Sequence, residues 1–193
     1  MRIEDKMDIY LIGVGGQGIG LLSEALIRAA DYAGLPVRGV DTHGLAQRGG
    51  TVTSHVRIGA QAHSALIKDG SADMVVALER YEALRGLNSH LTDGGTLVYY
   101  DAVWQPLDVR LGKNPPLDWQ VIREECKRRS VRNLRVKSET LPDARMQNVV
   151  ILAEIAKHTL ISGVALEDYE HALRDLLDGQ VLEKNLALFN SLL

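Results

Sequence analysis

The stretch YLIGVGGQGIGLLSEALIRAADYAGLPVRGVDTHGLAQRGGTVTSHVRI, residues 10–58, decides the fold. Its first apolar run stops at Gly13, and a helical pattern of apolar residues covers residues 19–33. A second apolar run follows at residues 36–40. The order strand, glycine turn, helix, strand predicts a βαβ unit in a Rossmann-like α/β fold with a mostly parallel sheet.

Four glycines lie between the first strand and the helix, at Gly13, Gly15, Gly16 and Gly18. A strand that turns at once into a helix needs residues that tolerate a positive φ. The N–H groups at the start of such a helix suit an anion, for example a phosphate or a carboxylate. The turn is therefore typical of a dinucleotide-binding domain, although it also fits a tight connection that binds no ligand.

Asp41 ends the second strand at the position of a ribose-binding carboxylate, as the dinucleotide pattern requires. Two other features depart from that pattern. Gln17 brings a side-chain amide into the turn. A second glycine-bearing loop, THGLAQRGG, follows Asp41 directly. Because loops that follow parallel strands emerge at the same edge of a sheet, we expect the two loops to be neighbours. That edge would carry His43, Gln47 and Arg48 beside the glycine turn.

Two of the polar side chains at this edge, His43 and Arg48, have two interpretations each. His43 either contacts a ligand or bonds to a carbonyl of its own loop. Arg48 either clamps an anion, for which its planar guanidinium is suited, or forms a salt bridge with Asp41 or Glu24. His55 belongs to the polar face of a third strand, residues 51–58, and is expected to be solvated.

GVGGQG followed by HGLAQRGGTVTSHVRIG resembles the gamma-type subunit, or domain, of the 2-oxoacid:ferredoxin oxidoreductases. The HG-x-AQRGG form is most similar to the indolepyruvate branch, in which this component is the small beta subunit. The resemblance covers residues 8–60, and Glu183-Lys184-Asn185-Leu186 is similar to a family ending. The motif positions that match form the predicted ligand or interface loops: Gly13, Gly15, Gly16, Gln17, Gly18, His43, Gly44, Gln47, Arg48, Gly49 and Gly50.

The resemblance implies a subunit that works within a larger enzyme. In this family a 2-oxoacid is decarboxylated on thiamine diphosphate and Mg, electrons pass through Fe-S clusters to ferredoxin, and the acyl group passes to coenzyme A. It implies that those cofactors lie in thiamine diphosphate-binding and ferredoxin-type partner subunits. This chain would place its glycine-rich edge near the active site or the coenzyme A path, with no catalytic residue or cofactor of its own.

Cysteine content and net charge limit which cofactors and partners the chain can bind. Cys126 is the single cysteine, so the chain cannot ligate a four-cysteine Fe-S cluster, and a structural or surface thiol is expected. The scattered histidines have no metal-ligand spacing, so no metal site is expected. A formal net charge of −3 offers no general attraction to nucleic acid or an anionic membrane. The absence of a long apolar run and of a signal peptide predicts a cytoplasmic protein.

The rest of the chain continues the alternation of strands and helices within one domain, residues 1–193. We expect strands at 74–78, 96–100 and 133–137, a hairpin partner at 64–67, and a turn at 92–95. Helices are expected at 81–91, 119–129, 144–160, 166–177 and 181–193, the last three covering one face of the sheet. An irregular excursion is expected at 101–119. Two other functions stay open at this point: a free-standing NAD(P)-dependent reductase, and a scaffold or regulatory module.

Overall fold

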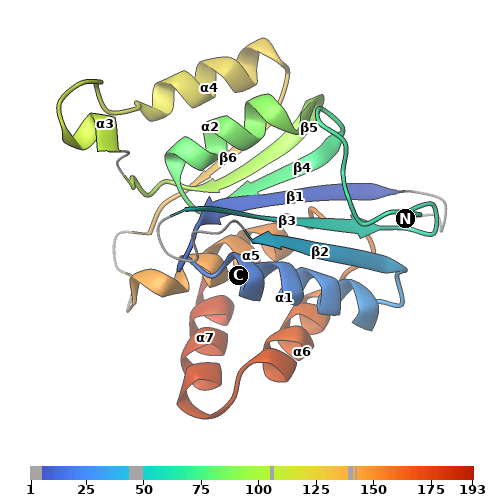
Figure 1. The fold of residues 1–193 in the computed structure, drawn as a ribbon. Helices are drawn as coiled ribbons and strands as arrows, with labels where there is room; N and C mark the ends of the chain where they lie inside the picture. Colours follow the sequence, from blue (N-terminus) through green and yellow to red (C-terminus); the bar gives the residue numbers. More distant parts are fainter. Residues whose placement is uncertain (1–5, 44–49, 105–106, 139–140, 142) are drawn as a thin grey trace.

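The computed structural model describes residues 6–43, 50–104, 107–138, 141 and 143–193. A six-stranded sheet in the order β2-β3-β1-β4-β5-β6 forms its middle layer (Figure 1). The predicted α/β fold class is confirmed. The strands are β1 (Met7–Val14), β2 (Val37–His43), β3 (Thr51–Ile58), β4 (Ala72–Ala77), β5 (Leu91–Tyr100) and β6 (Arg132–Val136).

The strand β3 makes the sheet mixed. It pairs antiparallel with β1, from Met7 opposite Ile58 to Val14 opposite Thr51, and antiparallel with β2 on its other side. The remaining strands all run in one direction, and β4, β5 and β6 pair parallel in turn. The two strands of the predicted βαβ unit are therefore not neighbours. Alternating apolar residues occur in parallel and antiparallel strands alike. The sequence pattern of β3 therefore does not predict that this strand lies between β1 and β2.

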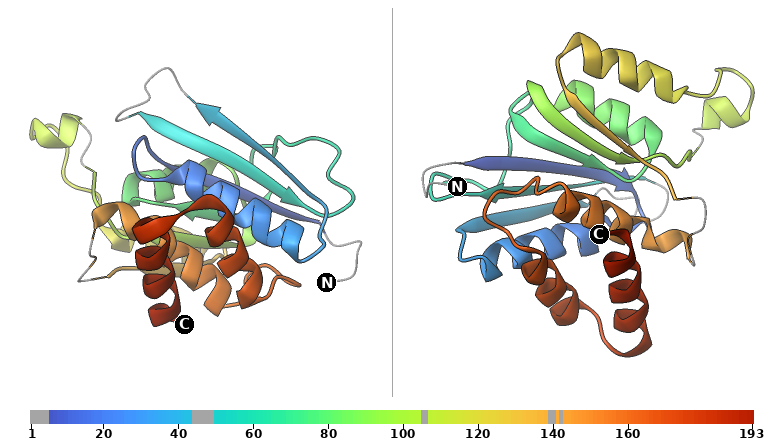
Figure 2. Two further views of the ribbon diagram at one scale, coloured as in Figure 1. Left: turned by 90° about the horizontal axis from the view of Figure 1, so that it is seen from below. Right: turned by 180° about the vertical axis from the view of Figure 1, so that it is seen from behind.

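Helices cover both faces of the sheet (Figure 2). On one face lie α1 (Ile19–Tyr32), α5 (Gln147–Lys157), α6 (Leu166–Leu176) and α7 (Gly179–Leu192). On the other lie α2 (Arg80–Ser89) and α4 (Trp119–Arg128), and two short helices, α3 (Leu107–Arg110) and η1 (Ala144–Met146), complete the described part. The predicted helical C-terminal part thus covers one face. No described helix has the length and apolar character needed to cross a membrane.

Each face of the sheet has its own hydrophobic core because side chains of a strand alternate in direction. Ile9 and Leu11 of β1 face α1, α5 and the C-terminal helices, where Phe189 is fully buried. Tyr10 and Ile12 face α2 and α4. The strand that leads into the glycine turn is therefore buried on both sides, which fixes the position of the turn.

Three sequence predictions on this layer are corrected by the structure. Residues 92–95, predicted as a turn, lie within β5, but the pairing with β4 shifts register there, from Ala72 opposite Leu91 to Met74 opposite Thr96, and Gly94 has a φ of 77°. Residues 64–67 form no strand. His55 is buried rather than solvated: its Nδ1 accepts a hydrogen bond from the Ile67 N–H at 3.1 Å, and its ring meets Tyr10 edge-on at 5.1 Å between centroids. The segment between β3 and β4 covers the side of β3 that the sequence pattern marks as polar.

A buried ionic cluster holds the excursion after β5 against the sheet. Asp101 accepts hydrogen bonds from Arg80 Nε and Arg135 Nε, each at 2.7 Å. Burial raises the pKa of Asp101, but the hydrogen bonds from the two arginines outweigh it and hold the pKa below its usual range. Arg80 also donates to the Leu117 carbonyl at 2.7 Å. The described part of the 101–119 excursion is thus anchored at both of its ends.

Candidate functional site

The glycine turn after β1 closes on itself through Gln17. Its backbone N–H donates to the Val14 carbonyl at 3.1 Å, and its side-chain Oε1 accepts from the Val14 N–H at 2.8 Å. Gly16 and Gly18 adopt positive φ values of 100° and 85°. These angles require glycine because other residues reach them only with strain. The amide oxygen of Gln17, which the sequence places at a ligand edge, is therefore occupied in shaping the turn.

Close packing explains two of the other glycine positions. A Cβ at Gly13 would lie 2.9 Å from Ile19 Cγ1, and a Cβ at Gly18 would lie 2.5 Å from Asn148 Nδ2. Asn148 belongs to α5 and its Nδ2 donates to the Gly18 carbonyl at 3.4 Å. A Cβ at Gly16 would meet no atom within 4 Å, so this glycine borders open space. Gly18 therefore ties α1 to α5, whereas Gly16 lies on the accessible side of the turn.

The second loop reaches the glycine turn through its last residue. The Gly15 N–H donates to the Gly50 carbonyl at 2.8 Å, directly before the Thr51–Val14 pair of the sheet. This contact brings together two of the residues predicted for the site. Asp41 on β2 accepts from Ser23 Oγ of α1 at 3.1 Å, which places it against the helix.

The other predicted residues of this loop lie at or beyond the border of the described residues. His43 is paired with Val52 at the end of β2, while its side chain lies outside the described part of the structure. Gly44, Gln47, Arg48 and Gly49 lie outside the described residues altogether. The two interpretations of His43 and of Arg48 therefore stay predictions.

Two buried carboxylates lie beside this edge and were not identified from the sequence. Glu79 caps α2 by accepting from the Glu82 N–H, and Glu82 Oε1 pairs with Thr51 Oγ1 at 3.2 Å and Arg85 Nη1 at 3.0 Å. Burial raises the pKa of both carboxyl groups. Glutamate is not one of the preferred N-cap residues, so Glu79 carries no capping signal in the sequence. The second required the fold, because Thr51 is far from Glu82 in sequence.

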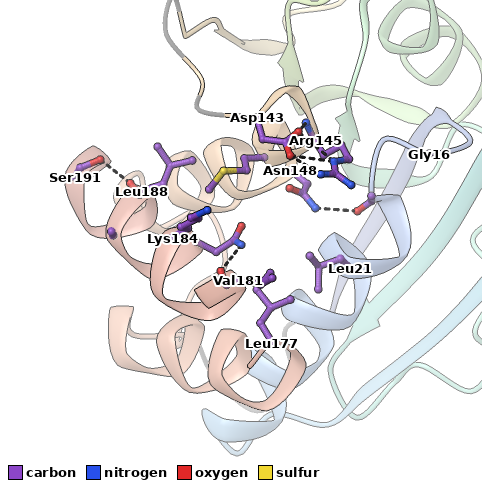
Figure 3. Close-up of a pocket in the computed structure, with 14 residues that line it drawn as sticks. Gly16, Leu21, Asp143, Arg145, Asn148, Leu177, Val181, Lys184, Leu188 and Ser191 are labelled. Carbon is purple, nitrogen blue, oxygen red and sulfur yellow. Dashed lines mark hydrogen bonds and ion pairs between the residues drawn. The ribbon is translucent and has the colours of Figure 1, made fainter. Parts of the chain in front are cut away.

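A cavity of about 830 Å³ opens between the glycine turn and α7 (Figure 3). Its walls come from the turn and α1 (Gly16, Gly18, Leu21), from η1 and α5 with the residue before them (Asp143, Arg145, Met146, Asn148), and from α7 and the connection before it (Leu177, Val181, Lys184, Asn185, Ala187, Leu188, Ser191). The volume falls in the range of small-molecule sites, roughly 300–1,000 Å³. Only its turn residues were predicted site residues. The Glu183–Leu186 stretch had been noted without a role, and it supplies Lys184 and Asn185.

Three charged side chains line this cavity, Asp143 and Arg145 side by side and Lys184 on α7 (Figure 3). Arg145 pairs with Asp143 at 2.6 Å between Nη2 and Oδ2, and its hydrogen bonds lower the pKa of Asp143 to about 2. Lys184 adds a second cation to the lining. Among the described residues, no group of three or more His, Cys, Asp and Glu side chains could hold a metal ion.

Comparisons with known proteins agree on one family. The family model described as pyruvate ferredoxin/flavodoxin oxidoreductase matches residues 8–191. Indolepyruvate oxidoreductase subunit IorB of Archaeoglobus fulgidus is 33% identical over 186 residues, covering 94% of this chain and 90% of the relative. The subunit of the same name from Methanothermobacter thermautotrophicus is 32% identical over 188 residues, covering 94% and 93%.

Solved structures show the same fold at lower identity. The gamma subunit of a keto/oxoacid ferredoxin oxidoreductase from Geobacter sulfurreducens has a TM-score of 0.65 and 20% identity, covering 95% of this chain and 94% of that one. A 2-oxoglutarate:ferredoxin oxidoreductase from Magnetococcus marinus, with 2-oxoglutarate, coenzyme A and succinyl-CoA bound, has a TM-score of 0.64 and 19% identity. It covers 98% of this chain, but this chain covers only 30% of that one. The family model and the relatives together show that the chain belongs to the pyruvate ferredoxin/flavodoxin oxidoreductase family.

Proposed function

We propose that this protein is the small, gamma-type subunit of a 2-oxoacid:ferredoxin oxidoreductase, most similar to the indolepyruvate enzymes. The observation that carries the proposal is the match of the family model to residues 8–191, together with relatives that are themselves named as subunits. The Magnetococcus marinus enzyme also supports a module that works with other parts. There the matching fold makes up less than a third of a longer chain. In this proposal the decarboxylation and electron transfer take place in partner subunits.

The role proposed for this chain is to complete the coenzyme A side of the active site. The glycine turn offers an accessible Gly16, and the Gly15 N–H bonds to Gly50, the last residue of the second motif loop. Coenzyme A is bound in the Magnetococcus marinus enzyme, whose fold includes this module. Thiamine diphosphate, Mg and the Fe-S clusters are assigned to the partner subunits, with ferredoxin as the acceptor.

The sheet order argues against a dinucleotide reductase. In a dinucleotide-binding βαβ unit the two strands are adjacent, about 4.8 Å apart, and the acidic residue of the second strand reaches the ribose. Here β3 lies between β1 and β2, which doubles that separation to roughly 10 Å. The carboxylate of Asp41 also accepts from Ser23. We expect no binding of NADH at physiological concentration by the isolated protein.

Co-purification under anoxic conditions tests the proposal. Tagged protein from its native source should bring down a thiamine diphosphate-dependent subunit, and the complex should reduce ferredoxin with an aryl 2-oxoacid in a reaction that needs coenzyme A. A complex rebuilt without this chain should lose that activity, which separates a required subunit from a bystander. Recovery of the protein alone, or full activity of the complex without it, would contradict the proposal.

A further inference from the structure

We propose that Trp104 and Arg85 anchor an interface with the thiamine diphosphate-binding subunit, which offers an apolar pocket to the indole ring and a carboxylate to the guanidinium. This inference rests on the proposed function, in which the glycine-rich edge completes an active site of the partner subunits. It assigns a docking surface next to the two motif loops, whereas the proposed function concerns the loops themselves.

Trp104 is an exposed tryptophan on the segment that follows β5. Because β1, β4 and β5 run parallel, this segment leaves the sheet at the same edge as the glycine turn (Figure 1). Trp104 is 60% exposed, its neighbour Val103 is 40% exposed, and neither residue belongs to a hydrophobic core. Tryptophan side chains are mostly buried within a chain, and in subunit interfaces they are frequent hot spots. The indole ring is therefore available to a partner.

The segment that carries Trp104 is held in place by the chain itself. The buried ionic cluster around Asp101 lies at its start, and the Arg80 N–H donates to the Ala102 carbonyl at 2.9 Å. The Trp104 N–H also donates to Glu79 Oε2 at 3.5 Å. A side chain presented from a fixed backbone loses less conformational freedom on association than one on a mobile loop. Trp104 is thus pre-organised for docking.

Arg85 of α2 is the second anchor, and only one side of its guanidinium is occupied. Its Nη1 donates to Thr51 Oγ1 at 2.7 Å and pairs with Glu82 Oε1 at 3.0 Å. The side chain is nevertheless 58% exposed, and no acceptor for its Nε or Nη2 lies among the described residues. A planar guanidinium with free donors binds a carboxylate through two parallel hydrogen bonds. Arginine is also a frequent hot-spot residue.

Glu82 shows that this edge lacks a group within the described part of the chain. Its Oε1 bonds to Thr51 and Arg85, whereas its Oε2 is buried and has no hydrogen-bond partner among the described residues. Glu82 is only 6% exposed, so bulk water does not satisfy this oxygen. A donor that a partner subunit presses against the edge would satisfy it, as buried polar atoms require. The partner surface therefore carries an N–H or O–H group next to its carboxylate.

A continuous series of contacts joins this surface to the glycine turn. The series runs through Trp104, Glu79, Glu82, Thr51, Gly50 and Gly15. A subunit that covers the glycine turn, as the proposed function requires, therefore borders on Trp104 and Arg85 as well. The proposed function requires neither a second copy of this chain nor a ferredoxin-type subunit at that edge.

Surface plasmon resonance between the tagged full chain and the thiamine diphosphate-binding subunit recovered with it tests the inference. Trp104→Ala and Arg85→Gln should each raise the Kd at least about tenfold, as the loss of a hot-spot contact does. Trp104→Ala should leave the melting temperature unchanged because the ring is exposed, so it decides the test even where Arg85→Gln fails to fold. Arg85→Gln removes the charge but keeps an amide donor, and circular dichroism checks its folding.

Two variants serve as matched controls. Leu66, on the connection between β3 and β4, is 58% exposed, and Arg174 of α6 is 54% exposed and paired with Glu170. Leu66→Ala and Arg174→Gln should leave the Kd unchanged. Wild-type affinity in Trp104→Ala, or an equal loss in the controls, overturns the inference and leaves the proposed function standing. A wild-type chain that binds no such subunit contradicts both. Loss of self-association with unchanged binding of the subunit assigns the surface to a second copy and also overturns the inference.

Discussion

Replacing Gly18 by alanine tests whether the glycine turn is held by close packing on α5. The residue has a φ of 85°, and the new Cβ would lie 2.5 Å from Asn148 Nδ2. A non-glycine residue in this backbone region costs about 1–2 kcal/mol, and overpacking a closed contact costs about 1–3 kcal/mol more. Reduced freedom of the unfolded chain returns about 0.4–1 kcal/mol. We expect Gly18→Ala to lower the free energy of unfolding by about 3 kcal/mol.

Gly34 provides the matched control. It has a φ of 72°, and a Cβ there would meet no atom within 4 Å, so Gly34→Ala should cost only the backbone contribution, about 1 kcal/mol. Urea denaturation gives both values, and the melting temperature of Gly18→Ala should fall by roughly 6–12 °C for a chain of this size. The double variant Gly18→Ala/Asn148→Ala should be more stable than the two single changes added together, because it removes the clash. Equal costs at Gly18 and Gly34, with additive double-variant values, would refute the packing argument.

Three other predictions concern buried groups. Asp101→Asn should lower the free energy of unfolding by about 3 kcal/mol, since it leaves two arginines without their buried carboxylate; a change below 1 kcal/mol in urea denaturation would count against it. Burial, with smaller effects from the charges of neighbouring residues, lowers the pKa of His55. The unfolded chain therefore binds the proton more readily, and the stability that His55 contributes is lost as pH falls below its unfolded pKa of about 6.5. His55→Gln should flatten the loss of stability between about pH 7 and 5, and an unchanged pH profile would show that His55 is not its source. The Cys126 side chain is 1% exposed, and burial raises the pKa of its thiol to about 11. Because the reactive thiolate is both scarce and covered in the folded chain, a disulfide reagent should modify Cys126 at least about a hundredfold faster in urea than in buffer.

The sequence predicted where strands and helices lie along the chain better than it predicted which strands pair in the sheet. The run of β1, the four glycines and the apolar spacing of α1 are local signals, and the structure has each element where these place it. The insertion of β3 between β1 and β2 was not predictable, because the direction of a strand leaves no mark in its alternation. His55 was misjudged for a related reason: it occupies the polar face of its strand, but a connection twelve residues further on covers that face.

The candidate site shows the same division. Gly15 and Gly50 could be brought together in advance, because both lie at the ends of strands at one edge. The cavity beside them could not, since it is assembled from α1, α5 and α7, whose mutual packing depends on the whole core. Lys184 and Asn185 carried a signal only as part of a stretch similar to a family ending. No periodicity or spacing rule would have directed them toward the glycine turn.

The position of β3 has a consequence for local opening. β1 is paired on both sides, with β3 and β4, whereas β2 is an edge strand paired only with β3 among the described strands. Amide hydrogens of an edge strand exchange through smaller openings than those of a central one. Opening of β2 therefore leaves β1 paired on both sides, so the turn at Gly15–Gly18 keeps its strand when this edge of the sheet opens.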